Sequence, residues 1–229
     1  MIDTILFDLD NTILDFDKAE EIALTKAFRA LNIEPTEQIM KRYSEINLAQ
    51  WKLLERGKIT RDEVKTGRYA LLFDEFEIDC SADLAESIYE KNLGIGHYYL
   101  DGAEELLQIL HNQYRLYIVT NGMADVQKGR IQSAKLRDYC QDIFISEEIG
   151  FNKPRREFFD FCFAKIPAFS KDKSVIIGDS LTSDIQGGIN AGIQTIWFNH
   201  DHIKNTSDVQ PDYVIDSLNE IKPILNSLN

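Results

Sequence analysis

The chain has 229 residues, of which 44% are hydrophobic, and a formal net charge of −13. This length and apolar content can bury the core of one large domain or two smaller ones, and they exclude a disordered chain. The acidic balance argues against binding to a nucleic acid polymer or to an anionic membrane surface, because both favour clustered positive charge.

The pattern of cysteine and apolar residues predicts a cytoplasmic protein. The three cysteines are odd in number and form no CxxC pair, which fits a reduced compartment better than a disulfide framework. The sequence holds no apolar run of about 18 residues, so no membrane span is expected. Its start lacks the basic and long apolar regions of a signal peptide, and none is expected.

Short runs rich in Ile, Val and aromatic residues predict buried strands. These runs are 4–7, 115–119, 143–145, 173–177, 194–198 and 213–215. Helices are predicted between them, at 101–112, 123–136, 154–165 and 182–191. Strands that alternate with helices indicate an α/β protein with a Rossmannoid, doubly wound parallel sheet covered by helices on both faces.

The first two predicted strands are separated by far more sequence than one crossover helix needs, since they start at residues 4 and 115. This interval predicts four helices, at 17–32, 36–56, 60–77 and 82–93. The simplest organisation is a helical cap domain, 15–95, inserted after the first strand of a core domain made of 1–14 and 96–229. Such a cap would cover the end of the first strand.

Polar and charged residues follow four of the predicted strands. They are Asp8, Asp10 and Thr12 after the first, Thr120 and Asn121 after the second, Lys153 after the third, and Asp179 and Asp184 after the fourth. Ligands of open α/β sheets bind outside the carboxyl ends of the strands, so we expect these side chains to form one site.

These residue types suit phosphate chemistry. Carboxylate oxygens such as those of Asp8, Asp10 and Asp179 are ligands that Mg²⁺ prefers. Thr120 and Asn121 can donate hydrogen bonds to phosphate oxygens, and Lys153 adds a positive charge. A carboxylate beside Mg²⁺ can attack phosphorus, and a second carboxylate can protonate the leaving oxygen and then activate water.

The order and spacing of these motifs resemble the haloacid dehalogenase (HAD) superfamily over the whole chain. The motifs are the DxDxT of Asp8 to Thr12, then Thr120, Lys153-Pro154, and the GDxxxxD of Gly178 to Asp184. The resemblance implies that Asp8 is the nucleophile and Asp10 the general acid and base. It implies that Mg²⁺ is held by the Asp8 side chain, the Asp10 carbonyl and Asp179, with Asp184 as a further carboxylate beside the metal ligands.

Softer features resemble the house-cleaning pyrimidine 5′-nucleotidase branch of this superfamily. They are FDLDNTILDF at the start, LLERGKIT at 53–60, TNG after the second strand and GDSLTSDIQGG at 178–188. The resemblance implies a phosphatase that acts on a small phosphorylated metabolite, such as a pyrimidine nucleoside monophosphate, as a monomer or homodimer. Arg155 and Arg156 depart from it, because many members carry an acidic residue there, and a more basic site mouth is expected.

Other activities of the superfamily stay open. A sugar-phosphate phosphatase or a phosphomutase would use the same residues, and a chain that keeps the fold only to bind ligands would not turn over. A halide-releasing dehalogenase is disfavoured because Asp10 is present, and such enzymes lack this acid.

Each motif residue also has an ordinary structural explanation. Asp8 and Asp10 fit a solvated turn, Thr120 fits strand packing, Lys153 fits a surface position, and Asp179 and Asp184 fit the first turn of a helix. For further features the structural explanation is preferred: a solvated loop for His200 and His202, cap core for Tyr43, Trp51 and Leu54, a surface face for Arg56, Lys58 and Arg61, and solvated faces for the pairs Glu20-Glu21 and Glu147-Glu148.

Overall fold

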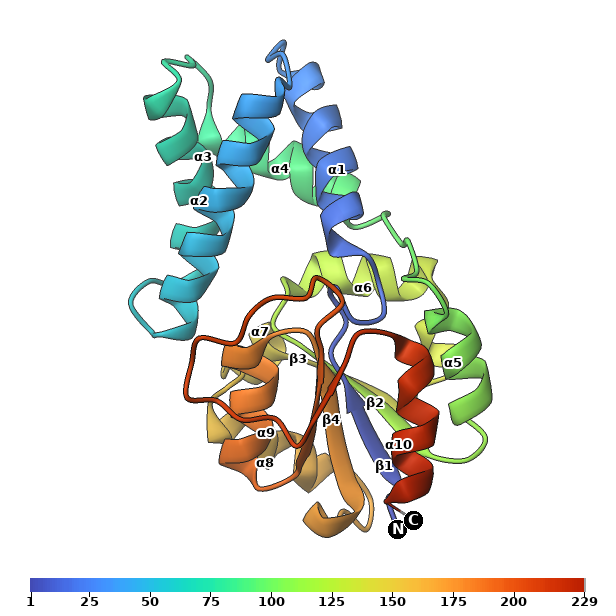
Figure 1. Ribbon diagram of the computed structural model, residues 1–229. Coiled ribbons are helices and arrows are strands. Elements are labelled where there is room, and N and C mark those ends of the chain that lie inside the picture. The colour runs from blue at the N-terminus through green and yellow to red at the C-terminus, as the bar shows by residue number, and fades with distance from the viewer. Residues whose placement is uncertain (229) are drawn as a thin grey trace. The chain divides into compact units, whose positions relative to one another are not determined.

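The computed structural model describes residues 1–228 and divides into two compact units (Figure 1). The first unit, here called the core, contains Met1–Phe16 and the chain from His97 onwards. The second, the helical unit, is Asp17–Gly96. The predicted cap, 15–95, spans nearly the same residues as the helical unit. Within residues 1–228, no helix is long and apolar enough to cross a membrane.

Residues 1–228 contain one six-stranded parallel sheet with the order β3-β2-β1-β4-β5-β6. The strands are β1 (Thr4–Phe7), β2 (Arg115–Thr120), β3 (Asp142–Ile145), β4 (Ser174–Gly178), β5 (Gln194–Phe198) and β6 (Tyr213–Ile215). The apolar runs predicted these positions to within about one residue, since strands buried on both faces carry continuous apolar sequence. The predicted doubly wound α/β sheet is therefore confirmed.

Helices connect the strands of the core. They are α5 (Ala103–Leu110), α6 (Ala124–Ser133), α7 (Ser146–Ile149), α8 (Arg156–Lys165), α9 (Gln186–Ala191) and α10 (Ile221–Ser227). Short helical turns lie at η1 (Leu136–Asp138), η2 (Lys171–Lys173), η3 (Leu181–Ile185) and η4 (Leu218–Glu220). One difference from the prediction concerns 182–191, because η3 is a wider π-type turn that continues into the regular helix α9.

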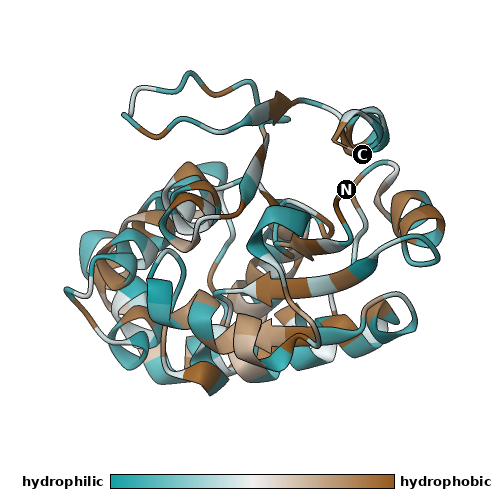
Figure 2. Ribbon diagram, turned by 90° about the horizontal axis from the view of Figure 1, so that it is seen from below, coloured by the Kyte–Doolittle hydropathy of each residue, from teal (hydrophilic) through white to brown (hydrophobic). Residues whose placement is uncertain are grey.

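The sheet has apolar layers on both faces, which is why its strands are apolar throughout. Ile5 and Phe7 of β1 belong to a buried cluster that includes residues of α5, α6 and α10. Leu6 faces the other way and belongs to a cluster with Phe158 and Phe159 of α8. Figure 2 shows the brown, hydrophobic colour along the strands. Successive side chains thus alternate between two layers of helices.

The strand order places the start of the sequence at the centre of the sheet. β1 pairs with β2 on one side and with β4 on the other, so that Phe7 lies opposite Ile118 and Ile177. The direction of strand succession reverses at β1, which is the usual position of a ligand site in this type of sheet. The residues after β1 therefore lie beside those that follow β2 and β4.

The helical unit contains α1 (Phe16–Ala30) from its second residue onwards, together with α2 (Glu37–Glu55), α3 (Arg61–Glu75) and α4 (Ala82–Leu93). Side-chain oxygens of Thr36, Thr60 and Ser81 cap the amino ends of the last three helices, which satisfies backbone groups that a helix end leaves without partners. Thr60 forms a reciprocal capping box with Glu63. Local sequence therefore fixes where three of the four helices begin.

The interior of the helical unit contains charged groups as well as apolar ones. Arg68 is 3% exposed and makes a two-pronged ion pair with Glu86 at 2.7 and 2.8 Å. Asn47 accepts a hydrogen bond from Arg68 and donates one of 2.7 Å to Glu20. Glu20 is only 6% exposed, so the prediction of a solvated face is wrong for this residue. Ser44 and Asn47 of the second helix and Tyr89 of the fourth supply the hydrogen-bond donors that burial of Glu20 requires.

The two connections between the units run side by side within the core. Leu14 forms an antiparallel bridge with Tyr99, and the Asp15 amide donates to the Tyr98 carbonyl at 2.7 Å. Leu100 in turn donates to the Ile13 carbonyl at 3.0 Å. The outgoing and returning segments thus form a short two-stranded ribbon.

Candidate active site

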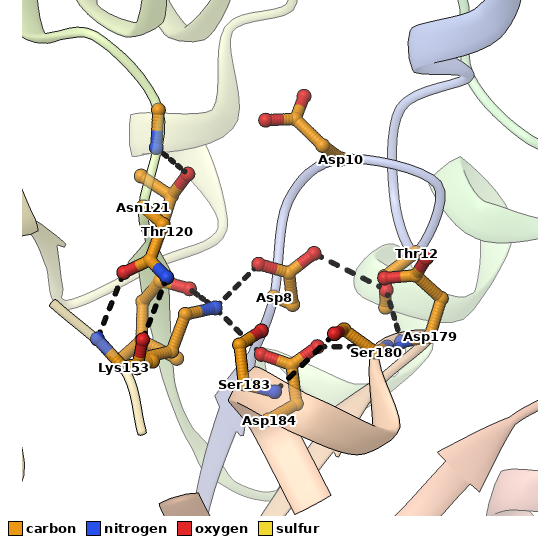
Figure 3. A network of polar contacts seen from close by, with 12 residues as sticks. Asp8, Asp10, Thr12, Thr120, Asn121, Lys153, Asp179, Ser180, Ser183 and Asp184 are labelled. Carbon is orange, nitrogen blue, oxygen red and sulfur yellow. Dashed lines mark hydrogen bonds and ion pairs between the residues drawn. The ribbon is translucent and has the colours of Figure 1, made fainter. Parts of the chain in front are cut away.

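Asp8 lies where β1 ends and is held from several sides (Figure 3). Its backbone amide donates to the Ile177 carbonyl of β4 at 2.9 Å, and the residue is 6% exposed. The Lys153 ammonium lies 2.6 Å from Asp8 Oδ1, and the Thr12 hydroxyl lies 3.4 Å from Asp8 Oδ2. Contacts to both oxygens fix the direction of the carboxylate.

Thr12 connects the loop after β1 with the loop after β4. Its hydroxyl oxygen accepts a hydrogen bond of 3.1 Å from the Asp179 amide while the hydroxyl hydrogen can be donated to Asp8. The side chain is fully buried. Thr12 therefore orders two of the predicted metal ligands relative to each other.

Lys153 is a buried cation, and the surface alternative does not hold for it. The residue is 1% exposed, and its ammonium donates to Asp8 Oδ1, to Asp184 Oδ1 and to the Val119 carbonyl at 2.6, 2.6 and 2.7 Å. Asn121 places its backbone, because the Asn121 amide side chain accepts from the Lys153 N–H and donates to the Lys153 C=O. A phosphate contact from Asn121 or Lys153 stays a prediction.

Asp179 and Asp184 bring two more carboxylates to this place. Single oxygens of Asp8, Asp179 and Asp184 all lie within 4.8 Å of one another. Asp184 is fully buried and accepts a hydrogen bond of 3.1 Å from the Ser180 amide. Gly178 makes this approach possible, because a Cβ atom there would lie 2.3 Å from Asp184 Oδ2.

The buried carboxylates carry unfavourable charge. Burial raises the pKa of Asp8 to about 7, against the attraction of Lys153, and the charges of Asp184 and Asp10 add to the rise. Desolvation and the charges of Asp8 and Asp184 raise the pKa of Asp179 well above its ordinary value. Burial alone would lower the pKa of Lys153, but Asp184 and Asp8 raise it.

This donor set fits a divalent cation. Three converging carboxylates face one ammonium, and oxygen-only sites of this kind suit Mg²⁺. A bound cation would offset the repulsion that raises the pKa of Asp8 and Asp179. The Asp8 and Asp179 side chains are the ligands that we expect, while Asp184 is already engaged by Lys153 and Ser180.

Asp10 lies in the loop after β1 and belongs to a second polar cluster, in which its partners are side chains of helix α6. Figure 3 shows its carboxylate turned away from Asp8. Arg130 forms an ion pair with Asp10 Oδ1, and Gln127 Nε2 donates to Asp10 Oδ2 at 2.6 Å. The same Gln127 nitrogen donates to the Thr120 hydroxyl oxygen at 2.9 Å. Arg130 and Gln127 are fully buried.

The sequence did not single out Gln127 and Arg130. Residues 123–136 read as an ordinary crossover helix with several polar side chains. The available signal was their spacing, because positions i and i+3 share one helix face, directly after the predicted Thr120 site. Trp197 was also missed, and its indole N–H donates to the Asp179 carbonyl at 2.7 Å.

The structure also describes the other residues that the sequence analysis considered. Arg155 pairs with Glu157 at 2.7 Å and Arg156 with Asp160 at 3.5 Å, so each arginine has an acidic neighbour, and a more basic site mouth stays a prediction. Among residues 1–228, the group of His, Cys, Asp and Glu side chains that could hold a metal is the Asp8 cluster and does not include His200 or His202. In the helical unit, Tyr43 and Leu54 are buried, Trp51 is half-buried, and Arg56 and Lys58 are exposed.

Comparison with known proteins identifies the family. The family described as haloacid dehalogenase-like hydrolase matches residues 5–198. YfnB of Bacillus subtilis, named only as a hydrolase of this family, is 43% identical over 99% of this chain and 96% of its own length. Its magnesium-bound crystal structure superposes with a TM-score of 0.94 and covers 98% of this chain and 99% of that chain.

Two further relatives carry names with a substrate class. The pyrimidine 5′-nucleotidase PynA of Streptococcus pneumoniae is 38% identical over 97% of this chain and 94% of its own. The pyrimidine 5′-nucleotidase YjjG of Escherichia coli is 30% identical over 97% of both chains. A family match across most of the chain, the α/β fold and the Asp8 site agree, and the chain belongs to the haloacid dehalogenase-like hydrolases.

Proposed function

We propose that this hydrolase is a Mg²⁺-dependent phosphatase that cleaves phosphate from pyrimidine nucleoside monophosphates through an aspartyl-phosphate. The observation that carries the proposal is the position of Asp8 at the centre of the sheet, with its carboxylate held by Lys153 and Thr12 and converging on Asp179. The names of the relatives PynA and YjjG support the substrate class.

The chemistry of the first step falls to Asp8 and Asp10. An oxygen of the Asp8 carboxylate attacks phosphorus, and the bond between phosphorus and the leaving oxygen breaks. Asp10 gives its proton to that oxygen, so the nucleoside leaves as a neutral alcohol. When bound, Mg²⁺ supplies positive charge that stabilises the negative phosphoryl oxygens.

The second step regenerates Asp8. Asp10, now ionised, accepts a proton from a water molecule that attacks phosphorus, and the bond between phosphorus and the Asp8 oxygen breaks. Inorganic phosphate is released. The proton that Asp10 gave in the first step is thereby recovered.

Thr120 is suited to hold a phosphoryl oxygen. Its hydroxyl oxygen accepts hydrogen bonds from Gln127 Nε2 and from the Gly122 amide at 2.9 and 3.1 Å. A hydroxyl has two acceptor lone pairs and one hydrogen, so with both lone pairs engaged its hydrogen can be donated to substrate. Lys153 adds positive charge beside Asp8.

Phosphate release from a substrate panel tests the proposal. The panel holds UMP, dUMP, dTMP, CMP, purine monophosphates, sugar phosphates and phosphoglycolate, each with Mg²⁺ and with EDTA. We expect Mg²⁺-dependent release concentrated on the pyrimidine monophosphates. Asp8→Asn should lower it by about 10³-fold or more, whereas Glu34→Gln, at an exposed carboxylate, should leave it unchanged.

Other results would redirect the assignment. Release concentrated on sugar phosphates would keep the roles of Asp8 and Asp10 and replace the substrate class. Isomerisation of a sugar phosphate without free phosphate would identify a mutase. Hydrolysis by Asp8→Asn at the wild-type rate would contradict the mechanism.

A further inference from the structure

Helix α6 contributes Gln127 and Arg130 to the site, and the mechanism above uses only the hydrogen bond from Gln127 to Thr120. Arg130 Nη1 pairs with Asp10 Oδ1 and donates to Gln127 Oε1 at 3.3 Å. Gln127 Nε2 donates to Asp10 Oδ2 and to Thr120 Oγ1. One amide therefore joins the predicted acid to the predicted phosphate-binding hydroxyl.

Burial makes Arg130 depend on the partners around it. Arg130 is 0% exposed and Gln127 is 1% exposed, and burial of a guanidinium without an anionic partner costs several kcal/mol. The Arg130 guanidinium also lies over the Phe16 ring, 5.7 Å from its centroid. The cation is thus held by a carboxylate, an amide and an aromatic face.

We propose that Arg130 and Gln127 are positioning residues that aim the Asp10 carboxylate at the leaving oxygen of the substrate. The inference rests on the proposed phosphatase function and assigns residues to its proton-transfer step. Asp10 reaches the leaving oxygen, and Arg130 and Gln127 act through Asp10.

The direction of Asp10 fits this task. In an in-line displacement the leaving oxygen lies on the far side of phosphorus from the attacking oxygen. The acid must therefore lie apart from the attacking oxygen, and Figure 3 shows the Asp10 carboxylate separate from that of Asp8 and turned away from it. Each carboxylate oxygen has two lone pairs, so the contacts from Arg130 and Gln127 leave acceptor sites for the transferred proton.

The dependence of rate on the leaving group separates positioning from a merely structural role. An alkyl phosphate such as UMP needs protonation of its leaving oxygen, whereas 4-nitrophenol leaves readily without it. We expect Arg130→Met to lower kcat/KM for UMP about 10- to 100-fold more than for 4-nitrophenyl phosphate, in line with the size of general acid catalysis. Arg130→Lys, which keeps the charge, should recover part of the difference.

The matched control is Lys128→Met on the same helix. The Lys128 side chain is 54% exposed and pairs with Glu148, so this variant should keep the wild-type ratio between the two substrates. If Arg130→Met fails to fold, Gln127→Leu removes the other donor to Asp10 and should change the ratio in the same direction. Equal losses on both substrates would overturn the inference.

A thermal double-mutant cycle tests the contact without using activity. The melting temperatures of Asp10→Asn, Arg130→Met and the double variant should be non-additive, with the double variant losing less than the sum of the two single losses. Additive losses would overturn the inference whatever the kinetics. A wild-type protein that hydrolyses neither ester would contradict the proposed function, while the cycle would still report whether Arg130 holds Asp10.

Discussion

The Lys153 ammonium lies 2.6 Å from Asp8 Oδ1, so the predicted nucleophile is paired with a buried cation. The same ammonium lies 2.6 Å from Asp184 Oδ1. Lys153 therefore has an electrostatic role in the folded protein before any substrate is present, because it offsets the charge of carboxylates that crowd the end of β1.

Removal of this cation should destabilise the core. We expect Lys153→Met to lower the free energy of unfolding by about 3–5 kcal/mol in EDTA, because the variant leaves buried carboxylates without their partner. Excess Mg²⁺ should restore part of the loss by offsetting the same charge. Urea unfolding with and without Mg²⁺ measures both effects, and a variant as stable as the wild type in EDTA would contradict this role.

Gly178→Ala should disturb the site through one added methyl group. Its Cβ would lie 2.3 Å from Asp184 Oδ2 and 2.4 Å from Asp184 Cγ, and Asp184 is fixed by Lys153 and Ser180. We expect a loss of about 1–3 kcal/mol in the free energy of unfolding, together with weaker phosphatase activity.

The matched control for this variant is Gly67→Ala in helix α3. An added Cβ there would meet Gln50 Oε1 at 3.6 Å, an ordinary contact. This variant should gain up to about 1 kcal/mol from helix propensity. Equal effects of the two substitutions would show that the approach of Gly178 to Asp184 is unimportant.

Asp179→Asn should have opposite effects on the metal-free and metal-bound proteins. The raised pKa of Asp179 means that its charge is unfavourable in the fold, so the neutral amide should increase the melting temperature in EDTA. The same change removes a carboxylate that we propose as a metal ligand. At Mg²⁺ concentrations about 100-fold above the dissociation constant, the wild type should gain about 2.7 kcal/mol, and the variant should gain much less.

The exposed carboxylate of Asp172 provides the control, since Asp172→Asn should change neither quantity. Trp197 offers an independent signal, because its indole N–H donates to the Asp179 carbonyl. In a Trp51→Phe background, Mg²⁺ should alter the fluorescence of Trp197 and EDTA should reverse the change. If Asp179→Asn responds to Mg²⁺ like the wild type, Asp179 is not a ligand.

Loss of one partner of the buried Arg68–Glu86 ion pair should lower the free energy of unfolding more than replacement of both partners by apolar side chains. Arg68→Met leaves Glu86 and Glu20 without their cation and should cost about 3–5 kcal/mol in the free energy of unfolding. The double variant Arg68→Met/Glu86→Leu should recover most of this loss, because apolar side chains can fill the same space. Calorimetry of the three proteins tests this, and equal losses in single and double variants would contradict it.

Much of the core could be predicted from the sequence because its strands are buried on both faces. Residues such as Asp8 and Thr120 could be singled out because polar side chains follow several predicted strands, where ligand sites of open α/β sheets lie. Arg130 and Glu20 could not be found in this way. Their burial depends on which distant elements pack around them, and their local sequence is that of a solvated helix face. Asp184 lies in the wide turn η3, where it contacts Lys153. The spacing of apolar residues predicted a regular helix there and did not reveal this turn.

Because residues 13–15 pair with residues 98–100, the helical unit is inserted between two neighbouring positions of the core backbone. The chain leaves the core and returns to it at neighbouring backbone positions, so the core needs only a tight turn to close the gap at this point. Insertions of other lengths and folds could be accepted at the same two positions without a change in the sheet. A change confined to residues 17–96 would thus leave the strand pairings of the sheet in place, and with them the positions of Asp8 and Asp179.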